Sequence, residues 1–459
     1  MSVAPDVEAM DLGIEGGVVV NASGRVRGNV YVRDGRIAAV TPERLPARER
    51  VDADGLLVLP GMVDAHVHLM DPGDPEREDF PTGTAAAARA GVTTIIEHTH
   101  GWPVRSVADL EEKRAHLTAR SRVDFALGAH AWPDRLDEIG PLWRAGVAFV
   151  KAFTCTTHGV PGFDPAHLRG LFERVAAAGA VCLLHCEDES LTAEAERELR
   201  ATGRADGGVI PAWRNRDAEL TATGTVALLA ARTGARAVIA HVSNPDVLEL
   251  VAQARARGAQ LAVESCPQYL TLLEEEALEH GPFRKFTPPA RARSPRDLER
   301  MWDALASGSI DYMSTDHAPS TREQKRSGSI WDVHFGLPGI DTTLAVLLTA
   351  AFDGRLALER VVEAYALMPA RIYGLHPAKG HVAPGADADL VLVDPTARWT
   401  VRDEDVLSKA GWSPYAGQTL AARPVRTYLR GRLVSDGDHV VGEPGSGRML
   451  NGAGAPPAR

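Results

Sequence analysis

The feature that most constrains the fold is a repeated alternation of short apolar runs with helical segments between residues 57 and 373. Eight apolar runs have the length of buried strands, at residues 61–68, 93–98, 124–130, 148–153, 180–185, 237–242, 260–265 and 310–315. Helical patterns separate them, among them residues 106–120, 165–178, 246–257 and 295–307, and a long one covers 342–373. This alternation predicts a parallel (β/α)8 barrel of the TIM type. A doubly wound sheet is the alternative, but the strand count and the polar residues at the strand ends favour the barrel.

Both ends of the chain carry β segments of another style. Residues 13–40 contain short strand-like runs joined by turns, one of which is Asp34-Gly35, a dipeptide typical of hairpins. Strand-like runs return at 388–393, 425–429 and 432–434. We therefore expect residues 1–57 and 378–450 to pair into one small β-sandwich around a barrel of residues 58–377. Residues 451–459 are expected to form a flexible tail.

Charge and composition exclude several classes of partner. The formal net charge of −11 counts against nucleic acid and against an anionic membrane, because both require a basic surface. No stretch approaches the ~20 apolar residues of a membrane span, and residues 1–17 lack the apolar core of a signal peptide. The four cysteines form no Cys-x-x-Cys motif, which is typical of reduced thiols. We expect a cytoplasmic protein that acts on a small molecule.

Ionisable side chains stand at the C-terminal ends of several predicted barrel strands, where active sites of such barrels are built. His66 and His68 alternate along the first strand, so both side chains point to one face. A pair of this kind is often structural when it stands alone. Here the fourth, fifth, sixth and eighth strands add Lys151, His185, His241 and Asp316. Because burial of such groups is costly unless they are paired or bind metal, their concentration predicts a shared metal site.

The ligand types indicate which metal this site would hold. Four histidines and one aspartate suit Zn²⁺ or a similar divalent ion such as Mn²⁺, Co²⁺ or Fe²⁺. A lysine ammonium has no lone pair and cannot bind metal. Lys151 lies among apolar residues, which favours its neutral amine, and a neutral amine can take up carbon dioxide to form a carbamate that bridges two ions. Taken alone, without the other ligands, Lys151 is better explained by a structural salt bridge.

The sequence PGMVDAHVH at residues 60–68 resembles the signature of the amidohydrolase superfamily. Further stretches are similar to its cyclic-amide hydrolases, namely hydantoinase (dihydropyrimidinase), allantoinase and dihydroorotase. These stretches are DFPTGT at 79–84, ESCPQYL at 264–270, TDHAP at 315–319, GADADL at 385–390 and SPY at 413–415. The resemblance covers about residues 14–450. It implies two divalent metal ions, a small cyclic amide as substrate, and a homodimer or homotetramer.

The resemblance also assigns roles to the six strand-end residues. One ion would be held by His66, His68 and Asp316 and the other by His185 and His241, with carboxylated Lys151 as the bridge. A hydroxide shared by the ions would attack the ring carbonyl, and Asp316 would pass its proton to the leaving nitrogen. We therefore expect a hydantoinase- or allantoinase-like hydrolase. The alternatives are a dihydroorotase, another lactam or imide hydrolase and, from another class, a non-catalytic scaffold homologue, against which the complete ligand set counts.

Some residues depart from the pattern of the family and bear on the substrate. Dihydroorotases usually carry an arginine two residues after the second histidine; Met70 stands there, so bidentate recognition of a carboxylate is missing at that position. Gln268 replaces a histidine common in relatives, and Arg291 follows a Thr-Pro-Pro segment where relatives have Asn-Pro-Pro. Besides these three, we expect substrate contacts from four histidines near strand ends: His98, His100, His158 and His317.

Overall fold

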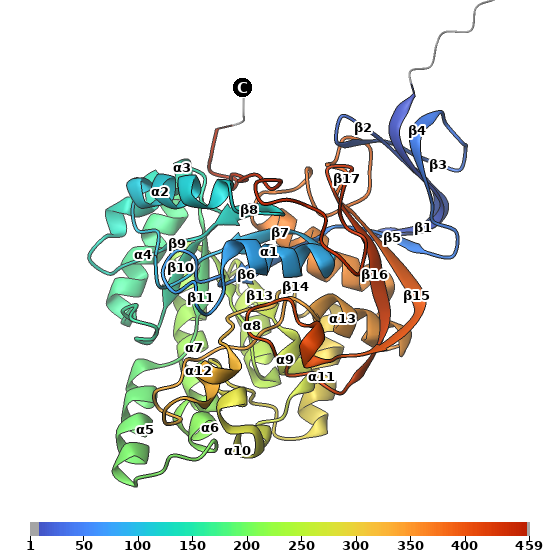
Figure 1. Cartoon of the computed structure of the whole chain (residues 1–459). Helices are drawn as coiled ribbons and strands as arrows, with labels where there is room; N and C mark the ends of the chain where they lie inside the picture. The colour runs from blue at the N-terminus through green and yellow to red at the C-terminus, as the bar shows by residue number, and fades with distance from the viewer. Residues whose placement is uncertain (1–8, 457–459) are drawn as a thin grey trace, which may run out of the picture.

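The computed structural model describes residues 9–456, and its central body is a barrel of parallel strands surrounded by helices (Figure 1). The barrel strands are β6 (Met62–Val67), β7 (Val92–Glu97), β8 (Asp124–Leu127), β9 (Ala129–His130), β10 (Val150–Phe153), β11 (Val181–His185), β12 (Arg236–Ile239), β13 (Leu261–Ser265) and β14 (Tyr312–Met313). They form two hydrogen-bonded groups, β6-β7-β8 and β9 to β14. The predicted (β/α)8 barrel is confirmed, with β8 and β9 together occupying its third strand position.

Two local features close the barrel. Gly128 separates β8 from β9, and a Cβ there would lie 2.3 Å from the ring of Phe149, so only glycine lets the chain pass this close. At the other seam, Val67 forms a parallel bridge with His317. The Thr315 backbone N–H also donates to Asp64 Oδ1 across a distance of 3.0 Å. The first and last strands are therefore joined by hydrogen bonds as well as by packing.

Helices cover the outside of the barrel, and polar caps mark where many of them begin. In α4 the Asp164 side chain accepts from the His167 backbone N–H, Pro165 occupies the first turn, and Gly179 ends the helix in a left-handed conformation. The helices up to the last barrel strand are α1 (Phe80–Arg89), α2 (Val107–Thr118), α3 (Ile139–Arg144), α4 (Pro165–Ala178), α5 (Glu189–Ala201), α6 (Val209–Trp213), α7 (Arg216–Thr233), α8 (Pro245–Ala256), α9 (Pro267–Thr271), α10 (Glu276–His280) and α11 (Pro295–Ser307).

After the last barrel strand the helical region is interrupted, where the sequence predicted one stretch over 342–373. Following the short α12 (Arg322–Arg326), it consists of α13 (Thr343–Phe352), α14 (Leu358–Val362) and α15 (Met368–Ile372), with a π-helical turn at Glu363–Leu367. Gly354 adopts a positive φ of 80° just after α13. A left-handed glycine at this point ends the helix, so periodicity alone joined two helices that the chain keeps apart.

The two chain ends meet in one eight-stranded sheet beside the barrel (Figure 1). Its strands are β1 (Met10–Asn21), β2 (Gly24–Arg33), β3 (Arg36–Thr41), β4 (Ala47–Asp52), β5 (Leu57–Pro60), β15 (Leu390–Thr400), β16 (Thr419–Leu429) and β17 (Arg432–Ser435). β5 pairs with β15, which joins the N-terminal strands to the C-terminal ones. Ile14, Val30 and Leu390 belong to a hydrophobic core separate from that of the barrel. The predicted pairing of the chain ends is thus confirmed. The boundary predicted between residues 57 and 58 falls within β5, so the exact domain limits remain a prediction.

The last described residues lie against the barrel, although the sequence predicted a flexible tail over 451–459. Gly452 donates its backbone N–H to Gly146 O at 2.9 Å. Gly454 runs so close to Trp143 that a Cβ would lie 2.3 Å from its carbonyl oxygen. The small residues that suggested disorder instead permit close approach of the chain through residue 456. Residues 457–459, like residues 1–8, lie outside the described part.

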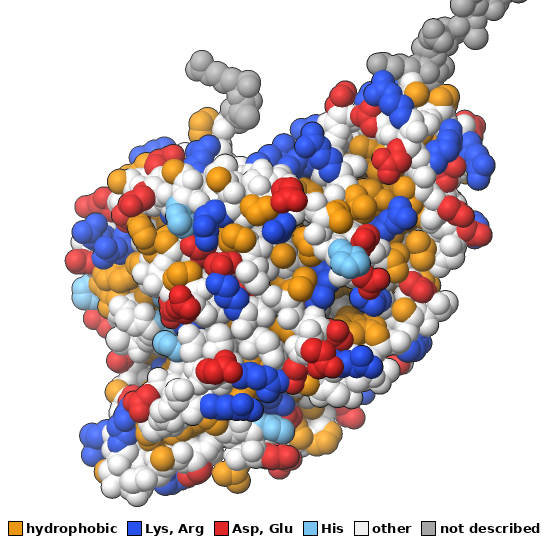
Figure 2. Space-filling model, viewed as in Figure 1, with side chains coloured by type: hydrophobic (Ala, Val, Ile, Leu, Met, Phe, Trp, Pro, Cys, Tyr) orange, Lys and Arg blue, Asp and Glu red, His pale blue; other side chains and the backbone are white. Residues whose placement is uncertain are grey.

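The surface carries charges of both signs (Figure 2), and the cysteines are buried. Acidic and basic side chains are interspersed over the face shown in Figure 2. Within residues 9–456, no helix has both the length and the apolar character needed to cross a membrane. All four cysteines, Cys155, Cys182, Cys186 and Cys266, are buried and form no disulfide.

Candidate metal centre and active site

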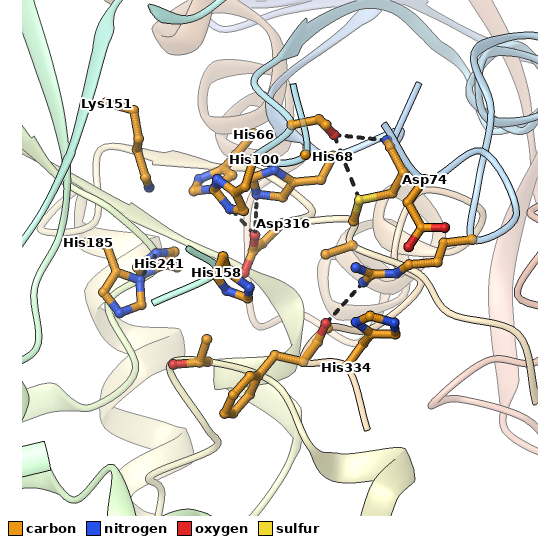
Figure 3. Close-up of a pocket in the computed structure, with 18 of the residues that line it drawn as sticks. His66, His68, Asp74, His100, Lys151, His158, His185, His241, Asp316 and His334 are labelled. Carbon is orange, nitrogen blue, oxygen red and sulfur yellow. Dashed lines mark hydrogen bonds and ion pairs between the residues drawn. The ribbon is translucent and has the colours of Figure 1, made fainter. Parts of the chain in front are cut away.

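A cavity of about 300 Å³ is lined by residues from the C-terminal ends of the barrel strands (Figure 3). All six strand-end residues predicted from the sequence line it, namely His66, His68, Lys151, His185, His241 and Asp316. They come from β6, β10, β11 and from the turns directly after β12 and β14. Residues separated by as much as 250 positions in the chain are therefore brought together, as the barrel geometry requires.

One group of candidate ligands is formed by His66, His68 and Asp316. Asp316 Oδ1 lies 3.3 Å from His66 Nε2 and 3.4 Å from His68 Nε2. Two ligands that each bind an ion at about 2.1 Å in tetrahedral geometry lie roughly 3.4 Å apart. Asp316 Oδ1 is thus spaced from each of the two histidine nitrogens as two ligands of one ion would be.

A second group lies on the other side of Lys151. His185 Nδ1 and His241 Nε2 face each other at 3.1 Å. Lys151 Nζ is buried and has no hydrogen-bond partner among the described residues. Buried polar atoms without partners are uncommon, and a lysine nitrogen aimed between two sets of ligands is explained by a group that bridges them. The donor set, with several neutral histidine nitrogens and a carboxylate around one cavity, therefore fits the binding of metal ions.

Buried carboxylates orient the ligand histidines through their second ring nitrogens. Glu264 Oε1 lies 2.7 Å from His66 Nδ1 and also accepts from the His241 backbone N–H at 3.0 Å. Glu187 Oε2 lies 2.7 Å from His185 Nε2. In metal sites such partners fix the ring orientation and leave the other nitrogen free to coordinate. Here they direct Nε2 of His66 and Nδ1 of His185 into the cavity.

Burial sets the protonation of this group. It lowers the pKa of His66 and His241 well below the ordinary value, and that of His185 in the same direction, so these rings are neutral at neutral pH and carry free lone pairs. Burial also lowers the pKa of Lys151, against the opposing charges of Glu264 and Asp316. For Glu187, burial alone would raise the pKa, but Arg214 and Arg291 hold it well below the usual range. His66, His185 and His241 are therefore neutral and able to donate lone pairs, and Glu187 beside His185 stays charged.

Backbone strain is concentrated at the cavity. Four residues that line it adopt positive φ although they are not glycine: Met70 (56°), His158 (54°), His241 (40°) and Asp316 (49°). Such conformations carry a cost and persist where the surrounding structure enforces them, often at functional sites. At His241 and Asp316 this turn of the chain follows the strand directly and points the side chain into the cavity.

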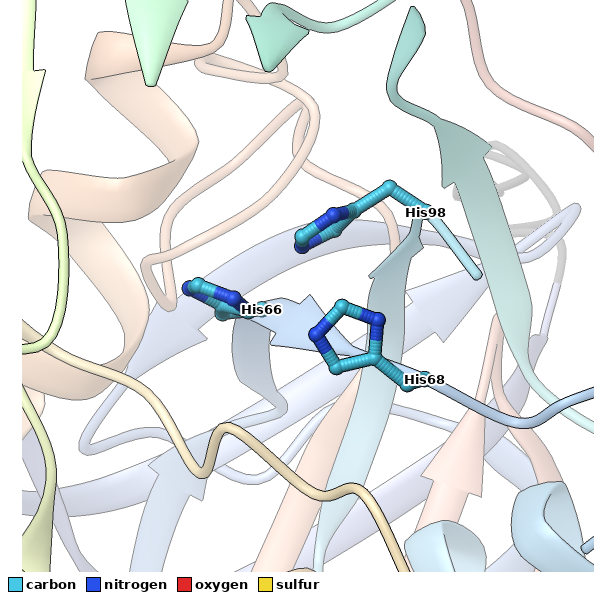
Figure 4. Close-up of side chains that lie close together, drawn as sticks. All are labelled: His66, His68 and His98. Atoms are coloured by element: carbon cyan, nitrogen blue, oxygen red, sulfur yellow. The ribbon is translucent and has the colours of Figure 1, made fainter. Parts of the chain in front are cut away.

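Three of the seven residues expected to contact substrate line the cavity, namely Met70, His100 and His158. The rings of His100 and His158 stack with 4.7 Å between their centroids. His98 lies behind His66 and His68, with ring centroids 4.5 Å and 4.4 Å away (Figure 4). One ligand atom of each of these three histidines lies within 4.8 Å of the other two. His98 is fully buried and packs against the metal side rather than facing the cavity.

The other three residues lie outside the cavity lining. Gln268 donates to Thr315 O at 3.2 Å, and His317 Nδ1 accepts from the Gly339 backbone N–H at 3.1 Å. Arg291 is fully buried in ion pairs with Glu187 and Glu219. These side chains have structural partners, so the structure places them around the site and not against a ligand in the cavity.

Sequence reasoning missed several residues of the opposite wall. Figure 3 shows Asp74 and His334 on the side of the cavity away from Lys151 and His185. The lining there also includes Arg77, Phe335 and Gly336. These residues lie in loops with no periodic pattern, and nothing in their local sequence indicates that the loops meet. The only available signal was the charge of Arg77 within ten residues of the His-x-His pair.

Comparison with known proteins agrees with this geometry. A model of the amidohydrolase family matches residues 57–434. The chain belongs to the amidohydrolase family. An allantoinase of Rubrobacter xylanophilus is 37% identical over 452 residues, covering 97% of this chain and 98% of the relative. A dihydroorotase of Halobacterium salinarum is 36% identical over 424 residues, covering 92% of this chain and 96% of the relative.

A solved structure shows the same fold. The L-hydantoinase (dihydropyrimidinase) from Arthrobacter aurescens superimposes with a TM-score of 0.92 at 32% identity, covering 96% of this amidohydrolase and 100% of that chain. The expected family, barrel fold and enzyme class are thus confirmed: the chain is a hydrolase of carbon–nitrogen bonds in cyclic amides. The family depends on two metal ions, and the alternative of a non-catalytic scaffold is set aside.

Proposed function

We propose that this amidohydrolase opens the ring of a small cyclic ureide, of the hydantoin or allantoin type, with two Zn²⁺ ions or similar divalent ions. His66, His68 and Asp316 hold the first ion, while His185 and His241 hold the second. The observation that carries this proposal is the convergence of all six strand-end groups on one cavity, with ligand atoms 3.1–3.4 Å apart. The similarity to an allantoinase and to an L-hydantoinase supports the type of ring.

Lys151 would bridge the two ions as a carbamate. A covalent bond forms between Nζ of the neutral amine and the carbon of carbon dioxide, and the nitrogen loses one proton. Burial favours the neutral amine that this step requires, because it lowers the pKa of Lys151. The absence of any partner for Nζ among the described residues leaves room for the added group.

Asp316 is the residue placed to move protons. The ions, when bound, lower the pKa of a water and polarise the substrate carbonyl. The Asp316 carboxylate is partly exposed to the cavity and lies next to both histidines of the first group. From there it takes the proton from the attacking water and delivers it to the ring nitrogen as the amide bond breaks. Glu264 and Glu187 act on the same step only by keeping the ligand rings in place.

Metal analysis and ring-opening assays test this function together. After purification with zinc and bicarbonate, elemental analysis should find two metal ions per chain, and mass spectrometry of the Lys151 peptide under native conditions should show the added carboxyl group. The loaded enzyme is then assayed on hydantoin, dihydrouracil, allantoin, dihydroorotate and simple imides. Ring opening of hydantoin or allantoin is expected, and failure on both with two ions bound would overturn the proposed ring type.

The oligomeric state is a further expectation that rests on the resemblance. We expect a homodimer or homotetramer that acts on its small substrate without nucleic acid or membrane. Light scattering of the purified chain measures its mass directly. A monomer at micromolar concentration would contradict this expectation and leave the ring chemistry untouched.

A further inference from the structure

The buried basic residues of this protein fall into two groups. Most of them have a carboxylate at ion-pair distance, as Arg291 has Glu187 at 2.5 Å and Lys113 has Glu97 at 2.6 Å. Within residues 9–456, the buried lysines and arginines with no carboxylate at that distance are Arg77, Lys151, Lys285 and Lys325. Lys151 is explained by the metal centre. The other three belong to one region of the molecule.

That region is the cavity wall opposite the metal ligands. Arg77 lines the cavity directly. Lys325 Nζ donates to Lys285 O at 2.9 Å and to His334 O at 2.8 Å, and Lys285 Nζ lies 4.5 Å from the ring centre of Phe335. His334 and Phe335 also line the cavity, so the two lysines stand directly behind its surface.

The guanidinium of Arg77 is held in place but not neutralised. Its Nε donates to Pro319 O at 3.0 Å and one terminal nitrogen, Nη2, donates to Phe335 O at 3.2 Å. The other terminal nitrogen, Nη1, has no hydrogen-bond partner among the described residues. Asp74 lines the same wall, yet its carboxylate does not come within ion-pair distance of Arg77. Burial lowers the pKa of Arg77 to about 10, which still leaves it positively charged at neutral pH.

A buried charge of this kind requires a counter-charge from elsewhere. Removing an ion from water is costly, and the fold gives Arg77 hydrogen bonds to two carbonyl oxygens and the charge of Asp74 from beyond ion-pair distance, which together offset only part of that cost. Lys285 adds positive potential at the same wall, since burial lowers its pKa only to about 8, and no carboxylate lies at ion-pair distance from it among the described residues. An anion that enters the cavity therefore meets a hydrogen-bond donor that is already in position. The interaction with Arg77 compensates most of the hydration energy that the anion loses.

We propose that Arg77 recognises a carboxylate carried by the substrate, so that the ring opened at the metal centre bears an acidic substituent directed to the opposite wall. This inference rests on the proposed function, since the cavity is the same. It also bears on Met70, where carboxylate recognition is missing: Arg77 supplies the missing cation from a position seven residues further along the chain. Arginine suits this role because its planar guanidinium donates to a carboxylate in fixed geometry.

A pair of substrates that differ only in charge tests the proposal. Hydantoin-5-acetic acid and hydantoin-5-acetamide have the same ring and nearly the same size, but only the acid is an anion at pH 7.5. We expect kcat/KM for the acid to exceed that for the amide by about 10- to 100-fold, the range expected for a hydrogen bond to a charged group. An acid-to-amide ratio at or below one in the wild-type enzyme would overturn the proposal.

Variants locate the preference at Arg77. In Arg77→Met the acid should lose about 10-fold or more in kcat/KM, while the amide changes by less than about 3-fold. Arg77→Lys keeps the charge without the fork and should retain part of the preference. The matched control is Arg326→Gln, which removes the same charge from an exposed residue next to Lys325 and should leave the ratio unchanged. An equal loss on both substrates in Arg77→Met, or a changed ratio in Arg326→Gln, would contradict the assignment.

Binding measurements separate this proposal from the proposed function. Calorimetry with the metal-loaded Asp316→Asn variant, in which loss of the proton carrier should slow ring opening by about 10²- to 10⁴-fold, gives Kd for the acid and for the amide, while kcat/KM is measured on the wild-type enzyme. If neither is hydrolysed but the acid binds about 10-fold more tightly, the ring type fails and the role of Arg77 stands. If both are hydrolysed with equal kcat/KM and equal Kd, the function stands and the role of Arg77 fails.

Discussion

The two walls of the cavity treat charge in opposite ways. On the metal side, Glu187 is surrounded by Arg214, Arg291 and His185, and each of these donors has an acceptor in the fold. On the opposite wall, Arg77, Lys285 and Lys325 have no carboxylate partner among the described residues. The difference teaches that the carboxylate beside the ligand histidine is paired before anything binds, which keeps that ring in a fixed orientation. The opposite wall, by contrast, is completed by what enters.

The largest expected effect comes from removing the proton carrier of the metal side. Asp316→Asn keeps the shape and one oxygen but cannot accept a proton, so kcat should fall by about 10²- to 10⁴-fold. Steady-state kinetics measures the loss, and elemental analysis should still find two metal ions per chain. Full activity in this variant would show that another group moves the proton.

The next largest effect is expected from removing one partner of a buried ion pair on the metal side, which should lower the stability of the protein. Arg291→Met leaves the buried carboxylates of Glu187 and Glu219 without the guanidinium that both use. We expect the free energy of unfolding to drop by about 3–5 kcal/mol. Denaturant unfolding of the metal-free protein measures this drop, and a loss below about 1 kcal/mol would mean that Arg214 compensates by itself.

A smaller effect is expected from a substitution that changes only the orientation of a ligand histidine. Glu187→Gln keeps the size of the side chain but removes the charge beside His185 Nε2. Metal affinity should fall by about 10- to 100-fold. Competition with a chromophoric chelator gives the two dissociation constants, and only one of them should change, because Glu187 contacts His185 but neither His66 nor His68.

For the opposite wall, we expect Lys285 to make the free energy of unfolding depend on pH. Burial lowers the pKa of Lys285 from 10.5 to about 8 in the folded protein. Between about pH 8 and 10.5 the unfolded chain therefore binds more protons than the folded one, and stability rises with pH across that window. Lys285→Met should lack this rise. Unfolding curves of both proteins at several pH values test the difference, and parallel profiles would contradict it.

The smallest effect is expected for Lys325→Met. This change removes a buried lysine that has no carboxylate partner, and whose pKa burial lowers well below the ordinary value, together with its hydrogen bonds to Lys285 O and His334 O. The two contributions oppose each other, so the free energy of unfolding should change by no more than about 1 kcal/mol. Measured beside Arg291→Met, it compares the two walls directly. A decrease in the free energy of unfolding as large as that of Arg291→Met would contradict the difference between the two walls.

The sequence predicts the metal side well because its signal is local. Each strand-end residue follows an apolar run, and a parallel barrel brings all such ends to one face, so His66, Lys151 and His241 needed no further information to be placed together. The pairing of the chain ends followed from the similar β segments at residues 13–40 and 388–434. Pro165 and Gly179 marked the limits of α4 equally clearly.

The rest depends on contacts that no local pattern encodes. Glu187 and Glu264 orient ligand histidines, yet in sequence they are ordinary acidic residues at or near strand ends. Arg291 was expected at the substrate and instead pairs with buried carboxylates, because a salt bridge is decided by tertiary distance. Arg77 was missed for the same reason: its loop reaches the cavity only through hydrogen bonds to Pro319 and Phe335.

The seam between β6 and β14 has a consequence for the order in which the enzyme becomes able to work. His66 and Asp316 meet only where the first barrel strand contacts the last, and Asp64 is bonded to Thr315 across that same seam. β5, which directly precedes β6, pairs with β15, so this contact also requires a later part of the chain. During synthesis, the ribosome must therefore release β14 and the turn after it before His66 and His68 can contact Asp316. A chain truncated ahead of residue 310 would carry five of the six ligands and still not form the first metal site.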